Sequence, residues 1–125
     1  MPHNMTIKAL NNSNYSDFLE SGQSVLVISE SWCPTCAEYK PIIQAVSDEL
    51  TGIDFYEAVL DQGRLGRLKR DHQDLIENIR YLPTTLLFEK GELKYQIEGA
   101  VDYDEAVAEI EEGFAQTNPS PEREI

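Results

Sequence analysis

Residues 25–36 read VLVISESWCPTC and place an apolar run just before the only two cysteines of the chain. The run from Val25 to Ile28 is typical of a central β-strand that is buried on both faces. Pro34 suits the first position of a helix, because the N–H that proline lacks is unpaired there in any case. The stretch therefore predicts a buried strand that passes into a helix, with Cys33 and Cys36 at the start of that helix.

The spacing of these cysteines is suited to reversible disulfide chemistry. Unpaired backbone N–H groups and the helix dipole favour an anion at the first turn of a helix. We therefore expect Cys33 to have a lowered thiol pKa and to form the thiolate, the species that attacks disulfides. Cys36 lies one turn further along the same face, where it can attack the mixed disulfide and release the substrate.

The same spacing also fits half of a zinc site. Zinc in proteins takes about four ligands, and the only histidines, His3 and His72, lie far from the cysteines in sequence. We therefore favour redox chemistry over metal binding. We expect no metal, and no cofactor other than a redox-active disulfide between Cys33 and Cys36.

Length and composition indicate one globular domain. The chain has 125 residues, of which 41% are hydrophobic, and this is enough to build a core. We expect a single domain over residues 1–116 and a flexible tail over residues 117–125, where two prolines occur and little can be buried. The formal net charge of −13 argues against a nucleic-acid partner, because a phosphate backbone would be repelled.

The sequence also gives an expectation about location. No apolar run approaches the roughly 20 residues that span a membrane, and Met1 to Asn14 has neither a basic start nor an apolar signal-peptide core. We therefore expect a cytoplasmic protein, and in that reducing compartment a lone Cys-x-x-Cys pair is more often catalytic than structural.

Strand and helix patterns alternate along the chain. Apolar and β-rich runs predict strands near residues 6–10, 25–28, 53–60, 84–88 and 93–97, with a turn at Lys90-Gly91 between the last two. Helical spacing predicts helices near residues 15–19, 34–50, 65–79 and 102–114, and Pro41 should kink the second of these. This order favours an α/β fold in which one mixed central sheet has helices on both faces.

Five landmarks in this order resemble the thioredoxin family, from about Met5 to Ala115. They are Trp32-Cys33-Pro34-Thr35-Cys36, Pro41, Leu82-Pro83-Thr84, Phe88-x-x-Gly91-Glu92 and Gly99-Ala100. The resemblance implies a thioredoxin-like fold and thiol–disulfide chemistry. The long segment from Asp61 to Pro83, together with Cys33-Pro34-Thr35-Cys36, also resembles thioredoxin-like accessory proteins of bacterial peptide (bacteriocin) export.

The resemblance implies a substrate-binding surface around the cysteines. Pro83 is expected to be preceded by a cis peptide bond and to face the disulfide, and the backbone of Leu82 is expected to pair with an extended substrate segment. Trp32, Pro34, Thr35 and Thr84 are expected to shape the same groove. Two alternatives stay open: Pro83 only ends a helix before a strand, or Trp32 packs in the core.

One position departs from the family. Thioredoxins carry a buried Asp six residues before the first cysteine, and this chain has Val27 there. That acid accepts the proton which the second thiol must lose. We hypothesise that Glu57, on the next strand, is the proton acceptor for Cys36; the alternative is that Glu57 points to solvent. Glu30 and Glu38 flank the cysteines, and their charge opposes a thiolate, which favours the disulfide form and a reductant's role.

The sequence thus predicts a thiol–disulfide oxidoreductase that reduces protein disulfides, with Cys33 attacking and Cys36 resolving. Its expected partners are protein disulfides and an electron donor of the thioredoxin-reductase type, and the expected state is a monomer. Two alternatives are an accessory or binding protein whose disulfide is regulatory or idle, and a glutathione-dependent enzyme or iron–sulfur carrier. The basic segment from Arg64 to Arg70 is either a solvated helix face or a docking patch for an acidic partner.

Overall fold

A computed structural model describes residues 7–62 and 64–115 of the chain. Its five strands form one mixed sheet in the order β1-β3-β2-β4-β5. The strands are β1 (Ile7–Ala9), β2 (Ser24–Ser29), β3 (Asp54–Val59), β4 (Thr84–Glu89) and β5 (Glu92–Glu98). β3 runs parallel to both β1 and β2, whereas β4 runs antiparallel to β2 and β5. The predicted mixed sheet is confirmed.

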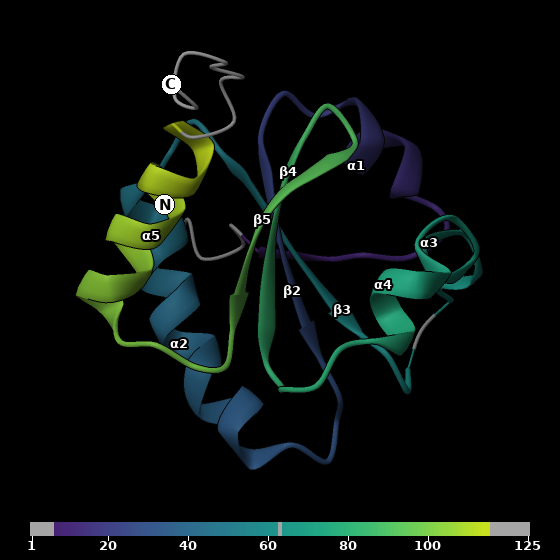
Figure 1. The fold of residues 1–125 in the computed structure, drawn as a ribbon, viewed down its shortest axis with the longest axis horizontal. Helices are drawn as coiled ribbons and strands as arrows, with labels where there is room; N and C mark the ends of the chain where they lie inside the picture. The colour runs from purple at the N-terminus through teal and green to yellow at the C-terminus, as the bar shows by residue number, and fades with distance from the viewer. Residues whose placement is uncertain (1–6, 63, 116–125) are drawn as a thin grey trace, which may run out of the picture.

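Helices cover both faces of this sheet (Figure 1). α2 (Pro34–Glu49) and α5 (Tyr103–Ala115) lie on one face, and α1 (Tyr15–Glu20), α3 (Gly66–Asp71) and α4 (Gln73–Glu77) lie on the other. β2 is central, and all six of its residues are buried. The continuous apolar run that begins at Val25 is thus explained, because a strand between two helical layers has no solvent-facing side.

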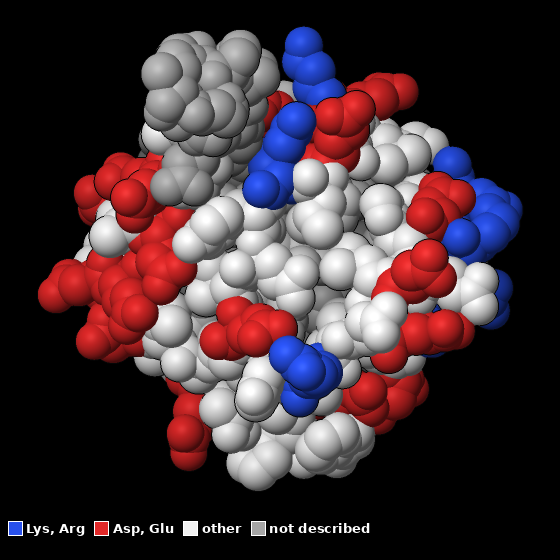
Figure 2. Space-filling view, viewed as in Figure 1, with Lys and Arg blue, Asp and Glu red and all other residues white. Residues whose placement is uncertain are grey.

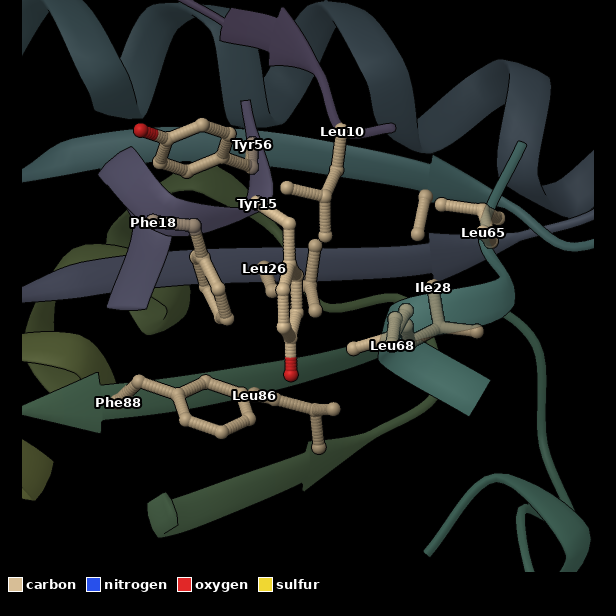
Figure 3. Close-up of a cluster of buried hydrophobic side chains, with 11 residues drawn as sticks. Leu10, Tyr15, Phe18, Leu26, Ile28, Tyr56, Leu65, Leu68, Leu86 and Phe88 are labelled. Carbon is tan, nitrogen blue, oxygen red and sulfur yellow. The ribbon is translucent and has the colours of Figure 1, made fainter. Parts of the chain in front are cut away.

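Each helical layer builds its own core against the sheet. On the α1 and α3 face, Phe18 lies at the centre of an aromatic cluster (Figure 3). Its ring centroid is 5.3 Å from that of Tyr56 and 4.9 Å from that of Phe88, both in edge-on geometry, which is a favoured arrangement of aromatic rings. On the other face the buried residues come from α2, α5 and the sheet: Val25, Val27, Tyr39, Ile43, Val46, Phe55, Leu87, Ile97, Ala106, Ile110 and Phe114.

The β4–β5 hairpin turns at Lys90 and Gly91, as predicted. Both residues have positive φ, 52° and 83° respectively, which is the signature of the two-residue turn whose twist matches that of the flanking strands. Gly91 also faces a close neighbour, since an added Cβ would lie 3.2 Å from the carbonyl oxygen of Leu19.

The predicted single helix over residues 65–79 is wrong. The segment forms two short helices, α3 and α4, that meet at His72, whose backbone leaves helical geometry (φ −128°, ψ 42°). His72 occupies a core-facing position of the apolar periodicity, and its ring packs edge-on against Phe88 with 5.3 Å between centroids. The break lets Leu68 of α3 and Leu75 of α4 pack against the same core.

Three further predictions concern the helices and the ends of the chain. Pro41 lies inside α2, and the kink expected there stays a prediction. The expected flexible tail, residues 117–125, falls outside the described residues. In the described part of the chain, no helix combines the length and the apolar character needed to cross a membrane.

Candidate active site

Cys33 and Cys36 form a disulfide at the start of α2, with their Cα atoms 5.2 Å apart. Cys33 is the N-cap residue and Pro34 follows at the first helical position, as the sequence predicts. The backbone N–H of Cys36 donates a hydrogen bond of 3.1 Å to Cys33 Sγ. Because hydrogen bonds to an anion are stronger than those to a neutral acceptor, the same N–H would stabilise a Cys33 thiolate in the reduced protein.

The loop before β4 faces the disulfide. The Leu82–Pro83 peptide bond is cis, and the carbonyl oxygen of Leu82 lies 4.0 Å from Cys33 Sγ. Pro83 is buried, and its carbonyl accepts a hydrogen bond of 2.8 Å from the N–H of Gly99. The loop that contains Pro83 therefore lies directly beside the sulfur of Cys33, and the role of Pro83 in substrate binding stays a prediction.

Thr84 differs from the other residues assigned to the substrate surface. Its side chain is fully buried, and its hydroxyl donates a hydrogen bond of 2.6 Å to the carbonyl oxygen of Tyr81. Thr84 therefore holds the loop from the interior of the protein. Its side chain is not on the surface that a substrate can reach, so its predicted place in the substrate groove is wrong.

Trp32, Pro34 and Thr35 lie on the surface beside the disulfide. The side chain of Trp32 is 66% exposed, so the core-packing alternative is wrong. The indole N–H of Trp32 donates a hydrogen bond of 2.6 Å to a carboxylate oxygen of Glu30. This bond holds an exposed aromatic ring in place next to Cys33.

Glu57 lies on β3 directly opposite Val27 of β2. The hydroxyl of Ser29 donates a hydrogen bond of 3.0 Å to one oxygen of Glu57. The ammonium of Lys40 lies 3.3 Å from the other oxygen, and the side chain of Glu57 is only 18% exposed. Glu57 and Cys36 both line a crevice of 200 Å³ that Cys33 and Lys40 also border. The structure thus places Glu57 and Cys36 at the same crevice and does not direct the Glu57 side chain into open solvent.

Two partners of Glu57 were not identified from the sequence. Lys40 lies on α2 one helical turn after Cys36, and a basic residue four positions after a cysteine is the signal that could have revealed it. Ser29 ends the buried strand β2. A polar side chain at the end of an apolar run is the sequence signal that could have revealed Ser29 as a partner of Glu57.

Asp61 fixes the loop between β2 and α2. One of its carboxylate oxygens accepts a hydrogen bond of 2.9 Å from the backbone N–H of Ser31, and the other accepts one from the hydroxyl of Ser31. These two bonds, that of the hydroxyl first, lower the pKa of Asp61. The pKa of Asp61 is therefore lower in the folded protein than in the unfolded chain. The two bonds stabilise the fold above the unfolded pKa of Asp, and this stabilisation is lost as the pH falls through the folded pKa of Asp61.

Metal binding gains no support from the arrangement of ligands. Across residues 7–62 and 64–115, no three His, Cys, Asp or Glu side chains come together as a group that could hold a metal ion. The sulfur atoms of Cys33 and Cys36 are bonded to each other in this structure.

Comparison with known proteins gives consistent matches. The family model described as Thioredoxin matches residues 6–112. Among curated proteins, thioredoxin Y of the chloroplast from Oryza sativa subsp. japonica is 26% identical over 101 residues, which is 79% of this chain. The match spans only 56% of the length of that relative.

Solved structures with the same fold include two plant thioredoxins. Oxidised thioredoxin O2 from Arabidopsis thaliana superposes with a TM-score of 0.68 at 22% identity, covering 90% of this chain and 97% of the other. Thioredoxin f from spinach chloroplast gives a TM-score of 0.70 at 19% identity and covers 87% of each chain. At these identities the superpositions establish the fold.

Proposed function

The chain belongs to the thioredoxin family, and we propose that it is a thiol–disulfide oxidoreductase that reduces disulfide bonds in other proteins. The observation that carries this proposal is the placement of the Cys33–Cys36 disulfide. It lies at the N-terminus of α2 with Cys33 Sγ beside the carbonyl oxygen of Leu82. An extended substrate segment that pairs with the backbone of Leu82 would bring its own sulfur to Cys33.

The reaction begins from the reduced form of the protein. The Cys33 thiolate attacks one sulfur of the substrate disulfide, the substrate S–S bond breaks, and the other substrate sulfur leaves as a thiolate that takes up a proton. Cys36 then loses its proton and attacks Cys33 Sγ, which forms the Cys33–Cys36 disulfide and releases the second substrate sulfur. Two electrons pass to the substrate, so a dithiol donor must reduce the protein again.

In this scheme Glu57 accepts the proton of Cys36. Cys36 is buried, and a buried thiol in an apolar site does not lose its proton readily. The crevice that Glu57 shares with Cys36 gives a short route for that proton, directly or through a water molecule. The ammonium of Lys40 and the hydroxyl of Ser29 hold the carboxylate in place.

We propose the reducing direction from the charges beside the cysteines. Glu30 lies next to the active-site crevice, and Glu38 lies two residues after Cys36 on α2. Their negative charge disfavours a thiolate at Cys33 and therefore stabilises the disulfide form relative to the dithiol. A reduction potential near about −270 mV would fit a reductant, whereas one near about −120 mV would mark an oxidant.

The remaining assignments follow from the proposed reaction. We expect protein disulfides as substrates, a thioredoxin-reductase-type electron donor, a monomer, and a working place in the cytoplasm. The disulfide itself is the only redox group that the scheme requires.

Replacing Cys33 by Ser tests the proposed reaction. Reduction of insulin disulfides, followed by turbidity with dithiothreitol as the electron donor, should be fast with the wild-type protein. It should fall to the uncatalysed rate with Cys33→Ser, because the attacking sulfur is gone. Equal and negligible rates for the two proteins would instead favour an accessory or binding protein, as in peptide export, whose disulfide is regulatory or idle. Bound glutathione or visible colour in the purified protein would favour the glutathione-dependent or iron–sulfur alternative.

A further inference from the structure

We propose that Tyr81 determines substrate specificity, by binding an apolar side chain that lies next to the attacked cysteine in the substrate protein. This inference rests on the proposed disulfide reduction and adds a preference for one class of substrate. Tyr81 was not among the residues that the sequence motifs singled out.

Two exposed aromatic residues lie on the loops beside the disulfide. Trp32 and Tyr81 are the two most exposed large hydrophobic residues of the described chain, at 66% and 54%. A single exposed aromatic residue is common and needs no explanation. Here, however, Trp32 precedes Cys33 in the chain, and Tyr81 precedes Leu82, whose carbonyl oxygen lies 4.0 Å from Cys33 Sγ. The two rings therefore belong to the two loops that meet at the attacking sulfur.

Both of these loops are held by hydrogen bonds. The carbonyl of Tyr81 accepts the hydroxyl of the fully buried Thr84 at 2.6 Å, and the indole of Trp32 donates to Glu30 at 2.6 Å. An aromatic side chain on a fixed backbone loses little conformational freedom when it binds, which is the property of residues that dominate binding surfaces.

The chemistry of this surface favours an apolar substrate residue. Aromatic rings offer a large contact area that gains free energy when it is removed from water. The carboxylate of Glu30 beside Trp32 already accepts the indole N–H. A substrate with Leu or Phe beside its cysteine would therefore gain contact area at Tyr81, whereas a substrate with Gly there would not.

The test compares disulfide-bonded peptides that differ at one position. Two peptides of the same sequence carry either Leu or Gly beside the attacked cysteine, and dithiothreitol serves as the electron donor. With Tyr81→Ala, the KM for the Leu peptide should rise about three- to tenfold relative to the KM for the Gly peptide. Tyr81→Phe keeps the ring and should retain the wild-type preference.

A second exposed tyrosine provides the matched control. Tyr103 is 37% exposed on α5, and Tyr103→Ala should leave the ratio of the two KM values unchanged. An equal rise in KM for the Leu and Gly peptides with Tyr81→Ala would overturn the inference. So would a change in the ratio of the two KM values with Tyr103→Ala that matches the change with Tyr81→Ala. A larger rise in KM for a peptide with Arg at that position would overturn the apolar preference. Reduction of hydroxyethyl disulfide by the wild-type protein tests the proposed function separately, because that small substrate has no neighbouring residue.

Discussion

At the scale of single residues, the pairing of Val27 with Glu57 sets this site apart from its family. The family's acid would lie on β2, where this chain has Val27. Glu57 supplies a carboxylate from the adjacent position on β3, and Lys40 pairs with it at 3.3 Å. In the proposed mechanism the acid therefore lies on the neighbouring strand and still borders the crevice that Cys36 lines.

Glu57→Gln should slow the resolution of the mixed disulfide. Gln keeps the shape of the side chain and can still accept the hydroxyl of Ser29, but it cannot take a proton from Cys36. We expect the rate of resolution near neutral pH to fall about ten- to a hundredfold, within the usual range for loss of a general base. Single-turnover measurements across pH should show the loss shrinking at high pH, where Cys36 ionises without help.

The matched control for this experiment is Glu38→Gln. Glu38 is also a carboxylate close to Cys36 in the chain, but its side chain is exposed on α2. Its removal should leave the rate of resolution close to wild type. Resolution by Glu57→Gln at the wild-type rate over the whole pH range would remove Glu57 from the mechanism.

The sequence predicts part of this site and leaves the rest undecided for a physical reason. Cys33, Cys36 and Pro83 belong to motifs whose spacing is local, so their positions follow from the chain itself. Successive side chains on a strand alternate between faces, so the direction of Glu57 depends on its register with β2. The register Val27↔Glu57 is a property of the assembled sheet. The exposure of Tyr81 is likewise a tertiary property that no motif encodes.

At the scale of helices and strands, α5 approaches the sheet closely at Gly113. An added Cβ there would lie 2.6 Å from a methyl carbon of Leu87 and 2.9 Å from the ring of Tyr95. Gly113 therefore lets α5 pack directly against β4 and β5 at this point.

Gly113→Ala should destabilise the protein by about 1–3 kcal/mol, the usual cost of overpacking a core. The higher helix propensity of Ala, worth about 1 kcal/mol, opposes this loss only in part. The midpoint of urea unfolding gives the measurement. Gly66→Ala is the control, because Gly66 is also helical but the nearest neighbour of its added Cβ, an amide nitrogen of Asn12, is 4.0 Å away. Unchanged stability of Gly113→Ala would show that α5 can move away from the sheet at little cost.

The segment between β3 and β4 shows what helical periodicity cannot predict. The apolar positions from Leu65 to Ile79 fit one helix, yet the backbone breaks at His72 to place its ring on Phe88. That contact joins residues far apart in sequence, so the local pattern does not contain it. Every predicted strand, by contrast, was placed correctly to within about two residues, because the alternation or continuity of apolar residues reflects burial directly.

Arg67 of α3 also holds this segment to α1. Arg67 donates to the carbonyl and hydroxyl oxygens of Asn12 and Ser16 at 3.4 Å, and its guanidinium lies 5.0 Å from the ring centroid of Tyr15. The hydroxyl of Tyr15 in turn donates to Asp71 at 2.9 Å. Burial raises the pKa of Tyr15, and the hydrogen bond to Asp71 adds to the shift. Arg67 is thus a structural residue, and docking of an acidic partner on this segment stays a prediction.

At the scale of the whole molecule, negative charge is unevenly spread. Figure 2 shows acidic side chains crowded on the side of the molecule where α5 lies. Within α5 the pKa of Glu105 is raised, first because its side chain hydrogen-bonds to Glu109 one turn away. Like charges at this spacing oppose each other, and the chain as a whole carries a formal net charge of −13.

Salt should therefore stabilise the folded protein. Screening of surface charges becomes strong when the Debye length falls to about 10 Å, near about 0.1 M salt. We expect the midpoint of thermal unfolding to rise by a few degrees between about 10 mM and 300 mM sodium chloride, which corresponds to a gain of about 1 kcal/mol. Neutralising two exposed acids of α5, Glu111→Gln and Glu112→Gln, should reduce this dependence. A midpoint that falls with salt would mean that attraction between opposite charges outweighs repulsion.

The complete burial of β2 has a consequence for how the molecule fluctuates. The residues of a central strand exchange their amide hydrogens only when most of the fold opens, whereas elements with few buried contacts open locally at low free energy. β2 leads directly into the cysteines, while α4 contains no buried residue. Transient opening of α4 would leave the sulfur atoms of Cys33 and Cys36 on intact structure. Cys33 and Cys36 thus follow directly on the part of the molecule that is expected to unfold last.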